Sequence, residues 1–315
     1  MAPLPHRCWH IRIRDEGAGL RKRFQKVVSE LIGDNENLVL LLGDIGVFGF
    51  RGSMAEYPSR VLNIGILEQA MTSFAAGLAM GGRIPVLHSI APFLIERPYE
   101  QLKVDFGYQG LAGKFISVGG SFDYAGLGAT HHSPGDVSAL LAIPGFEIFC
   151  PGTADELEFL LRKNLLRESL SYFRLSEYEF VDSRVKIELA SPQIISQHSD
   201  NVLIAFGPSM KEGSAVATDL DLSLIYVNEI TVDSSRRLSD LLASSEFRNV
   251  ILLQPFYQGT ASHLFQSGLN GKRVLDIGVP REFIHEYGTI EEIKKSLGLT
   301  VEAISGRILE FVNEK

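Results

Sequence analysis

A glutamate at the start of a predicted helix is the first residue whose position suits chemistry. In the segment Asn63-Ile-Gly-Ile-Leu-Glu68-Gln69, a strand end and a glycine-containing turn precede a helix that begins with the carboxylate of Glu68. The helix dipole also favours a carboxylate there, by roughly 0.3–1 kcal/mol, so a structural role explains Glu68 taken alone. The predicted helix over 68–80 is rich in small residues, which permit close approach of another subunit or dense core packing.

A second candidate is the loop Gly128-Ala-Thr-His131-His132-Ser-Pro-Gly-Asp136, which follows a predicted buried strand and several glycines. Such loops lie at the carboxyl edge of a parallel sheet, where ligands of α/β folds bind. Two adjacent histidines could also bind a metal, but no Cys or Glu lies at ligand spacing. We therefore expect His131 to contact a substrate rather than to serve the structure, and we expect no metal site in this chain.

The third candidate combines an aromatic ring with a cation. Phe93 and Arg97 lie in one segment beyond another predicted strand. Phe93 could stack on a flat heterocycle or fill a core, and Arg97 could bind an anion or cap the next helix. The glycines of Gly43-Asp-Ile-Gly-Val-Phe-Gly49 add no phosphate loop, because their spacing differs from the dinucleotide fingerprint and no Walker lysine follows.

The elements that position these residues alternate between strands and helices. The apolar run between Asn37 and Asp44 is typical of a strand buried on both faces of a parallel sheet. The other expected elements of this series are helices over 17–32, 68–80, 91–108, 135–142 and 153–167 and strands over 60–64, 84–88, 115–119 and 147–150. The alternation predicts a doubly wound α/β domain.

A second α/β series follows a polar segment without periodicity over 178–199, which we interpret as an inter-domain linker. Its strands are expected over 201–207, 224–228, 250–254 and 273–278. The sequence therefore predicts two successive doubly wound α/β domains with mostly parallel sheets. We place an N-terminal arm and helix over 1–35, the first domain over 36–185 and the second over 186–315.

Composition disfavours several classes of protein. The 315 residues carry a formal net charge of −8, and the basic run Arg21-Lys22-Arg23 is too short for a nucleic-acid binder. No apolar run approaches the roughly 18 residues of a membrane span, and the N-terminus lacks the apolar core of a secretory signal. Cys8 and Cys150 lie far apart without metal or redox spacing, which indicates free thiols in a reducing compartment, so we expect a cytoplasmic protein.

The order and spacing of these motifs resemble the transketolase family. The segments Gly43–Gly46, Arg60–Gln69 and Gly128–His132 resemble its pyrimidine-binding domain, which deoxyxylulose phosphate synthases and ketoacid dehydrogenase β subunits share. Asp276–Phe283 and Tyr287-Gly288 resemble its C-terminal domain. The resemblance covers most of the chain, and the combination of NxGxxEQ with GATHH is fairly specific.

The resemblance implies roles for individual residues. Glu68 matches a glutamate that hydrogen-bonds the aminopyrimidine of thiamine diphosphate and favours the imino tautomer that takes a proton from the thiazolium carbon. Phe93 matches an aromatic residue that packs on the pyrimidine, and His131 matches a histidine that contacts substrate oxygens. The remaining implied contacts are to the cofactor from Asp44 and Ile66 and to the substrate from His132, Arg97 and Arg174.

The resemblance also implies a second polypeptide. In this family a Gly-Asp-Gly motif and a later Asn hold the diphosphate and its Mg²⁺ or Ca²⁺, and no Gly-Asp-Gly occurs in this chain. We therefore expect a partner, the N-terminal subunit of a split transketolase, to bind the diphosphate and the metal. The family suggests a dimer of heterodimers, and we expect the chain alone to be inactive.

Departures from the family pattern bear on the substrate. Leu127 stands where ordinary transketolases have an acidic residue, and Glu177 stands where many have an arginine that binds substrate phosphate. Arg174 could compensate for the repulsive carboxylate of Glu177. The loop resembles that of split transketolase-like proteins of unusual or branched sugar biosynthesis, so sugars or sugar phosphates are expected. The segment Gln254–Gly259 differs from the family pattern, so the second domain is expected to organise the assembly rather than to catalyse.

The expected function is therefore the transfer of a two-carbon ketol unit between sugars, as the C-terminal subunit of a thiamine diphosphate enzyme. Two alternatives remain open. One is the β subunit of a ketoacid dehydrogenase, against which the Thr-His-His loop argues. The other is a non-catalytic scaffold, against which the joint presence of Glu68, Phe93 and His131 argues.

Overall fold

The strand β1, Leu38–Leu42, lies inside a sheet and is buried on both faces. Three of its leucines face one apolar core, while Val39 and Leu41 face another. The computed structural model describes residues 19–314. A strand with no polar face is stable only between two covered faces of a sheet, so this run explains why helices lie on both sides.

The first sheet has seven strands among the described residues, in the order β10-β5-β6-β4-β3-β1-β2. All neighbouring strands are parallel except β10 and β5. Besides β1, the strands are β2 (Val61–Asn63), β3 (Ile84–Ile90), β4 (Gly113–Val118), β5 (Phe146–Phe149), β6 (Leu170–Arg174) and β10 (Glu229–Ile230).

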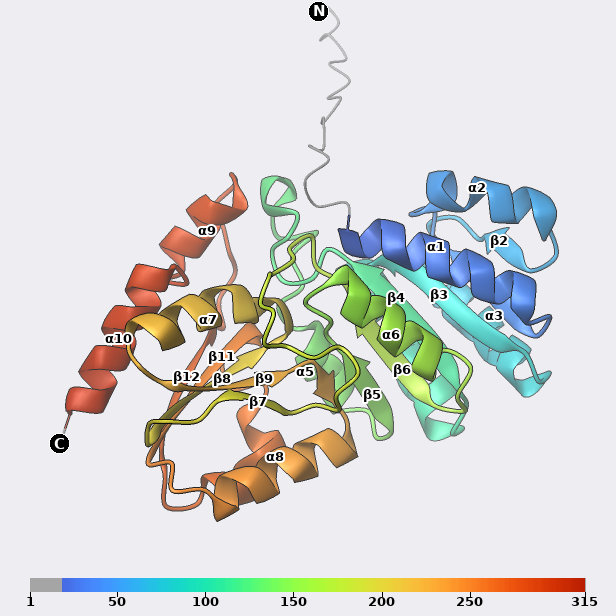
Figure 1. Ribbon diagram of the computed structural model, residues 1–315. Coiled ribbons are helices and arrows are strands. Elements are labelled where there is room, and N and C mark those ends of the chain that lie inside the picture. Colours follow the sequence, from blue (N-terminus) through green and yellow to red (C-terminus); the bar gives the residue numbers. More distant parts are fainter. Residues whose placement is uncertain (1–18, 315) are drawn as a thin grey trace, which may run out of the picture.

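Helices cover both faces of this sheet (Figure 1). On one face α1 (Gly19–Asp34) packs against α6 (Ala154–Asn164), and on the other α3 (Glu68–Met80) packs against β3. The other helical segments of this half are α2 (Val47–Glu56), η2 (Pro92–Glu96), α4 (Tyr99–Gln101), η3 (Leu102–Tyr108), η4 (Ala125–Leu127) and α5 (Asp136–Leu141).

The second sheet has five strands among residues 19–314, in the order β12-β11-β8-β9-β7, with only β7 antiparallel. These are β7 (Gln193–Ser196), β8 (Asn201–Phe206), β9 (Ser223–Val227), β11 (Asn249–Tyr257) and β12 (Arg273–Val279). The helical segments are η5 (Gly207–Ser209), α7 (Met210–Asp219), α8 (Val232–Ser244), η6 (Ser262–Leu269), α9 (Ile290–Ser296) and α10 (Val301–Asn313). The predicted fold class, α/β with mostly parallel sheets, is confirmed.

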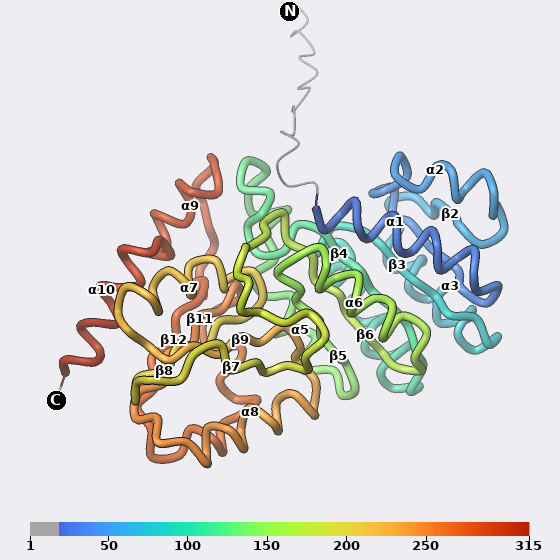
Figure 2. The backbone as a smooth tube through the Cα atoms, in the orientation of Figure 1, coloured from blue at the N-terminus to red at the C-terminus, as the bar shows by residue number. Residues whose placement is uncertain are grey.

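One apolar core joins the two halves, which lie side by side in Figure 2. It contains Leu41 and Phe146 from the first sheet and Ile204 and Leu252 from the second. The positions of the predicted domain boundaries stay a prediction, because β10 belongs to the second series along the chain and yet pairs with the first sheet.

Three strands lie where the sequence patterns predicted none: β6, β7 and β10. β6 contains Ser171 and Arg174, which interrupt its apolar pattern but are buried in polar contacts. β7 is an antiparallel edge strand inside the predicted linker. The helix predicted over 91–108 is present as η2, α4 and η3, with π-helical turns at both ends.

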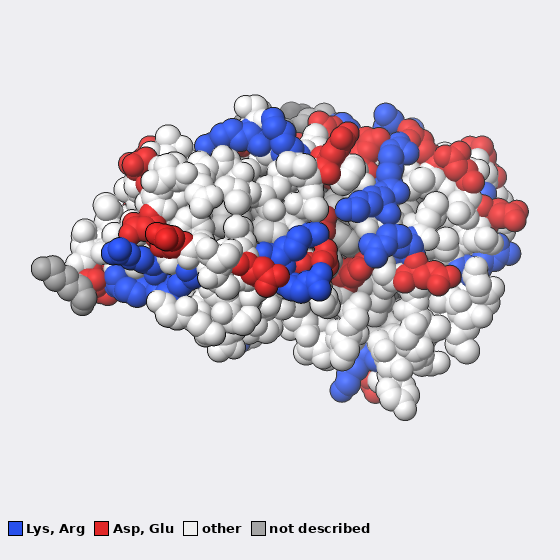
Figure 3. Space-filling view, turned by 60° about the horizontal axis from the view of Figure 1, so that its bottom comes forward, with Lys and Arg blue, Asp and Glu red and all other residues white. Residues whose placement is uncertain are grey.

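Charged side chains are spread over the surface seen in Figure 3, and the cysteine among the described residues is buried. On the face shown in Figure 3, acidic and basic side chains lie in small alternating groups with broad neutral areas between them. Over residues 19–314 no helix combines the length and the apolar character needed to cross a bilayer. Cys150 is a buried free thiol whose pKa burial raises to about 12, and Cys8 lies outside the described residues.

Candidate active site

The side chain of Asn63 connects the two loops that present Glu68. Its Oδ1 accepts hydrogen bonds from the backbone N–H of Asp44, at 3.0 Å, and of Gly65, at 3.0 Å. Gly65 has a φ of +80°, a conformation that a side chain disfavours. The turn after β2 is therefore tied to the loop after β1, and α3 begins at Glu68 directly beyond it.

Glu68 is only 1% exposed, and its two carboxylate oxygens differ in their partners. Oε2 accepts a hydrogen bond of 2.6 Å from Nη1 of Arg97, whereas Oε1 is buried without a partner among the described residues. An unsatisfied buried carboxylate oxygen is costly, and such groups nearly always have partners in native structures. The free oxygen of Glu68 therefore suits a hydrogen-bonding group on a bound molecule, such as the ring nitrogen of an aminopyrimidine.

An aromatic ring and a histidine lie next to this ion pair. The Arg97 guanidinium lies over the Phe93 ring, 4.3 Å from its centre, and the rings of Phe93 and His131 meet edge to face at 5.1 Å. Tyr124 lies on another side of His131, with ring centres 6.4 Å apart. The structure thus brings together Glu68, the Phe93–Arg97 segment and His131, which come from three separate parts of the sequence.

The surroundings of His131 favour the neutral form of its imidazole. Its Nδ1 lies 2.9 Å from the Thr130 hydroxyl, and burial, followed by the positive charge of Arg97, lowers its pKa. His132 is 7% exposed, and its ring nitrogens lie near the backbone of Tyr124 and Ala125 without a well-aligned hydrogen bond to any of residues 19–314. Burial lowers the pKa of His132 as well. A neutral histidine can both donate and accept hydrogen bonds to sugar hydroxyls.

The other predicted site residues lie in different surroundings. Asp44 has a φ of +65° and an exposed side chain, and Ile66 is 67% exposed at the turn before α3. Arg174 is 2% exposed: its Nε donates to Asp136 at 2.8 Å and its Nη2 to the Pro255 carbonyl at 3.3 Å. None of its hydrogen bonds, ion pairs or ring contacts in the described part of the chain reaches the Glu68 group.

Sequence reasoning missed the pairing of Arg97 with Glu68 and the role of Asn63. Asn63 offered a signal, because an Asn at a strand end beside a glycine turn commonly binds backbone N–H groups. The pairing of Glu68 with Arg97 offered none, since the two residues lie on different helical segments. Residues 19–314 contain no group of three His, Cys, Asp or Glu side chains able to hold a metal ion.

An exposed apolar surface borders Glu68. Along α3 and the turn before it, Ile66, Leu67, Phe74 and Met80 are 67%, 59%, 47% and 69% exposed. Tyr108 at the end of η3, a segment that packs on α3, is 89% exposed. We call Ile66, Leu67, Phe74 and Met80 the α3 surface. Apolar patches of this kind mark interaction sites.

Fold and site together define an α/β ligand-binding protein whose site lies where the strands of a parallel sheet end. A family model described as the transketolase, pyrimidine binding domain, matches residues 16–180. The chain therefore belongs to the transketolase family. Membership implies the use of thiamine diphosphate, and the half-satisfied carboxylate of Glu68 fits the pyrimidine end of that cofactor.

Individual relatives agree with this assignment. An uncharacterized 33.6 kDa protein in the fasciation locus of Rhodococcoides fascians is 31% identical over 293 residues, which cover 92% of this chain and 93% of that protein. A subunit of the apulose-4-phosphate transketolase of Phocaeicola vulgatus is 28% identical over 312 residues, covering 93% of this chain and 97% of that subunit.

Solved structures show the same fold. A structure described as a split gene transketolase, inactive beta4 tetramer, superimposes with a TM-score of 0.79 at 20% identity, covering 93% of this chain and 97% of that one. The chain spans about half the length of the 1-deoxy-D-xylulose-5-phosphate synthases that it matches, 48% in Geobacter metallireducens.

Proposed function

We propose that this chain is the C-terminal subunit of a thiamine diphosphate-dependent transketolase that transfers a two-carbon ketol unit between sugars. The observation that carries the proposal is the buried, unpaired Oε1 of Glu68. Family membership supports the cofactor, and the neighbouring aromatic ring and histidine support a site that holds a heterocycle beside a sugar.

The residues of the chain have distinct tasks in this proposal. When bound, the cofactor supplies a thiazolium ring that accepts the electron pair of the bond broken in the donor sugar. Glu68 shares a proton with the pyrimidine through Oε1, while Arg97 holds Oε2 and fixes the orientation of the carboxylate. Phe93 offers its ring to the heterocycle, and neutral His131 hydrogen-bonds substrate oxygens. Asp44 and Ile66 line the approach of the cofactor.

A partner subunit completes the proposed site. This chain has no Gly-Asp-Gly motif, so the diphosphate and its Mg²⁺ or Ca²⁺ are assigned to an N-terminal transketolase subunit. The α3 surface borders Glu68 and suits such a partner. A relative is named as one subunit of a transketolase, and a similar structure is titled as an inactive tetramer of beta chains. We infer a dimer of heterodimers acting on sugar phosphates of the apulose 4-phosphate type.

The test compares Glu68→Gln with the unchanged chain, each mixed with an N-terminal transketolase subunit that carries the Gly-Asp-Gly motif, thiamine diphosphate and Mg²⁺. Ketol transfer from apulose 4-phosphate and xylulose 5-phosphate is measured with a panel of aldose acceptors. We expect Glu68→Gln to lower kcat by about 10²–10⁴-fold, because proton transfer by a positioned group contributes that much, and to leave the melting temperature nearly unchanged.

Glu100→Gln is the matched control, since Glu100 is an exposed carboxylate in the first turn of α4. It should behave like the unchanged chain. Full activity of Glu68→Gln would show that the carboxylate has no catalytic task, as expected of a scaffold. Strong activity of the unchanged chain without its partner would contradict the two-subunit proposal.

A further inference from the structure

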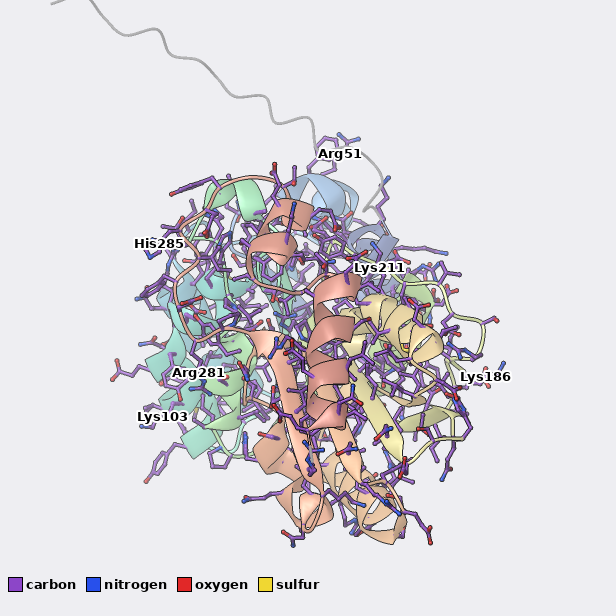
Figure 4. All side chains as sticks on the ribbon, turned by 90° about the vertical axis from the view of Figure 1, so that its left-hand side faces the viewer. Arg51, Lys103, Lys186, Lys211, Arg281 and His285 are labelled. Atoms are coloured by element: carbon purple, nitrogen blue, oxygen red, sulfur yellow. The ribbon has the colours of Figure 1, made fainter. Side chains whose placement is uncertain are left out.

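The segment 280–289, between β12 and α9, runs along the loop that carries His131. Figure 4 labels two of its residues, Arg281 and His285, on the flank where this segment passes the first half of the chain. The Tyr287 ring lies directly over Gly128: a Cβ at Gly128 would be 2.5 Å from it. Gly126 lies against the carbonyl of Gly288 in the same way, at 3.7 Å from its would-be Cβ.

The second half of the chain also holds the two ends of this loop. At the end, the backbone N–H of Tyr257 donates to the Pro134 carbonyl at 3.0 Å. At the beginning, the Ser121 hydroxyl donates to the carbonyl of Pro255. The Pro255 carbonyl and the Tyr257 N–H both lie at the end of β11. The loop over 121–134 is thus attached to the second half at its beginning, middle and end.

Hydrogen bonds inside the loop connect Gly128 with His131. The N–H of His131 donates to the carbonyl of Gly128 at 2.9 Å, and the N–H of Ser133 donates to that of Ser121 at 2.7 Å. Gly128 has a φ of +74° and a ψ of −168°, a conformation open essentially to glycine alone. A glycine can adopt many backbone conformations, so Gly128 by itself does not favour this one. Packing from outside is therefore needed to hold it there.

We infer that Tyr287 is a positioning residue for His131: its ring, pressed on Gly128, holds the loop in the geometry in which His131 meets the substrate. The inference rests on the proposed function and assigns the second half of the chain a task in substrate recognition. It also explains why an aromatic side chain that is 73% exposed is used at this place, since one face of the ring is enough to cover a glycine.

The first experiment measures amide hydrogen exchange in the free full-length chain. Tyr287→Ala should speed the exchange of the His131 and Ser133 amides by about tenfold or more, because local opening exposes their hydrogen bonds. Tyr287→Phe should restore protection, because ring carbons lie nearest to Gly128 and the Tyr287 hydroxyl, although it also lies close to Gly128, makes no hydrogen bond among the described residues. Phe283→Ala is the control: this ring on the same segment is 75% exposed and meets His285 instead. Unchanged exchange in Tyr287→Ala would overturn the inference.

The second experiment uses the complex with the N-terminal subunit, thiamine diphosphate, Mg²⁺ and the same two ketose phosphates. Misplacing a substrate contact by about 1 Å can cost up to 10²-fold. We expect Tyr287→Ala to raise KM for the ketose about tenfold with a smaller fall in kcat, and to leave the cofactor Kd unchanged. Tyr287→Phe and Phe283→Ala should match the unchanged complex.

The outcomes separate the two proposals. If Glu68→Gln is inactive and Tyr287→Ala has an unchanged KM, the positioning role is wrong and the proposed function stands. If Glu68→Gln is fully active, the proposed function is wrong, and the role of Tyr287 in substrate recognition falls with it. The exchange experiment then tests separately whether Tyr287 holds the loop in place. A Tyr287→Phe variant as impaired as Tyr287→Ala would assign the effect to the hydroxyl and overturn the packing argument.

Discussion

Arg97 resolves the problem that a buried carboxylate poses. Moving an unpaired carboxylate into the interior is expensive, and one charge-assisted hydrogen bond of 2.6 Å offsets much of that cost. Arg97 itself keeps 35% of its side chain exposed and lies over Phe93, so it stays solvated while it binds Glu68. The carboxylate can therefore be buried and still keep one oxygen for a ligand.

His131 should determine how activity falls in acid. Burial and Arg97 both lower its pKa, so the neutral form prevails at pH 7 and protonation begins only below the ordinary value of about 6.5. We expect kcat/KM to fall as pH decreases below that point. His131→Asn, which cannot be protonated, should lower kcat/KM at pH 7 by about 10–10²-fold and flatten this acid limb. If the loss of activity in acid is equally steep in His131→Asn, another group, such as His132, is responsible for it.

Elements with strong periodicity were predictable from the sequence, and those with mixed pattern were not. The helix over 68–80 and the strand at Leu38–Leu42 follow from apolar spacing alone. β6 was not predictable, because its Arg174 is matched by Asp136 on a distant helix. For the same reason, the site could be assembled only from motif resemblance: contacts such as that of Arg97 with Glu68 depend on the relative placement of elements.

The exposed side of α3 leads to a prediction about assembly. Phe74 is 47% exposed in the middle of the α3 surface, so a charge there would be buried unpaired in an interface. Phe74→Asp should weaken association with the N-terminal subunit at least about tenfold without changing the circular dichroism of the free chain. Light scattering and titration calorimetry measure this.

Val232→Asp is the control for that prediction, because Val232 is 90% exposed at the start of α8, away from α3. It should bind the partner normally. If Phe74→Asp and the unchanged chain bind the N-terminal subunit with equal affinity, α3 is not part of the interface.

At the scale of the whole molecule, the two halves are linked by a buried polar cluster. Arg174 pairs with Asp136 and reaches the carbonyl of Pro255, while the Tyr172 hydroxyl donates to the same Asp136 oxygen. Asp123 lies nearby, 8% exposed, and accepts hydrogen bonds from Ser176 and from the backbone of Glu177. Breaking such clusters costs more than any single surface contact.

Asp123 makes the stability of the chain depend on pH. Burial raises its pKa to about 7, against an unfolded value of about 3.9. The folded chain thus holds a proton that the unfolded chain has lost between these values, so stability decreases as pH rises through this window and stays low above pH 7. Asp123→Asn should lose less stability than the unchanged chain between pH 5 and pH 8, as measured by urea unfolding.

Asp240→Asn, at an exposed position of α8, should keep the pH dependence of the unchanged chain. Parallel pH profiles for Asp123→Asn and the unchanged chain would show that the carboxyl of Asp123 titrates normally.

The two-residue strand β10 has a consequence for how the protein can be divided. Glu229 and Ile230 close the outer edge of β5, although they come from beyond β9 in the chain. Without them, the N–H and C=O groups of β5 would face solvent as a template for strands of other molecules. A fragment that ends before residue 229 should therefore aggregate during expression, both because the edge of β5 is open and because the shared apolar core loses Val250, Leu252 and Phe256 of β11, while the intact chain stays dispersed.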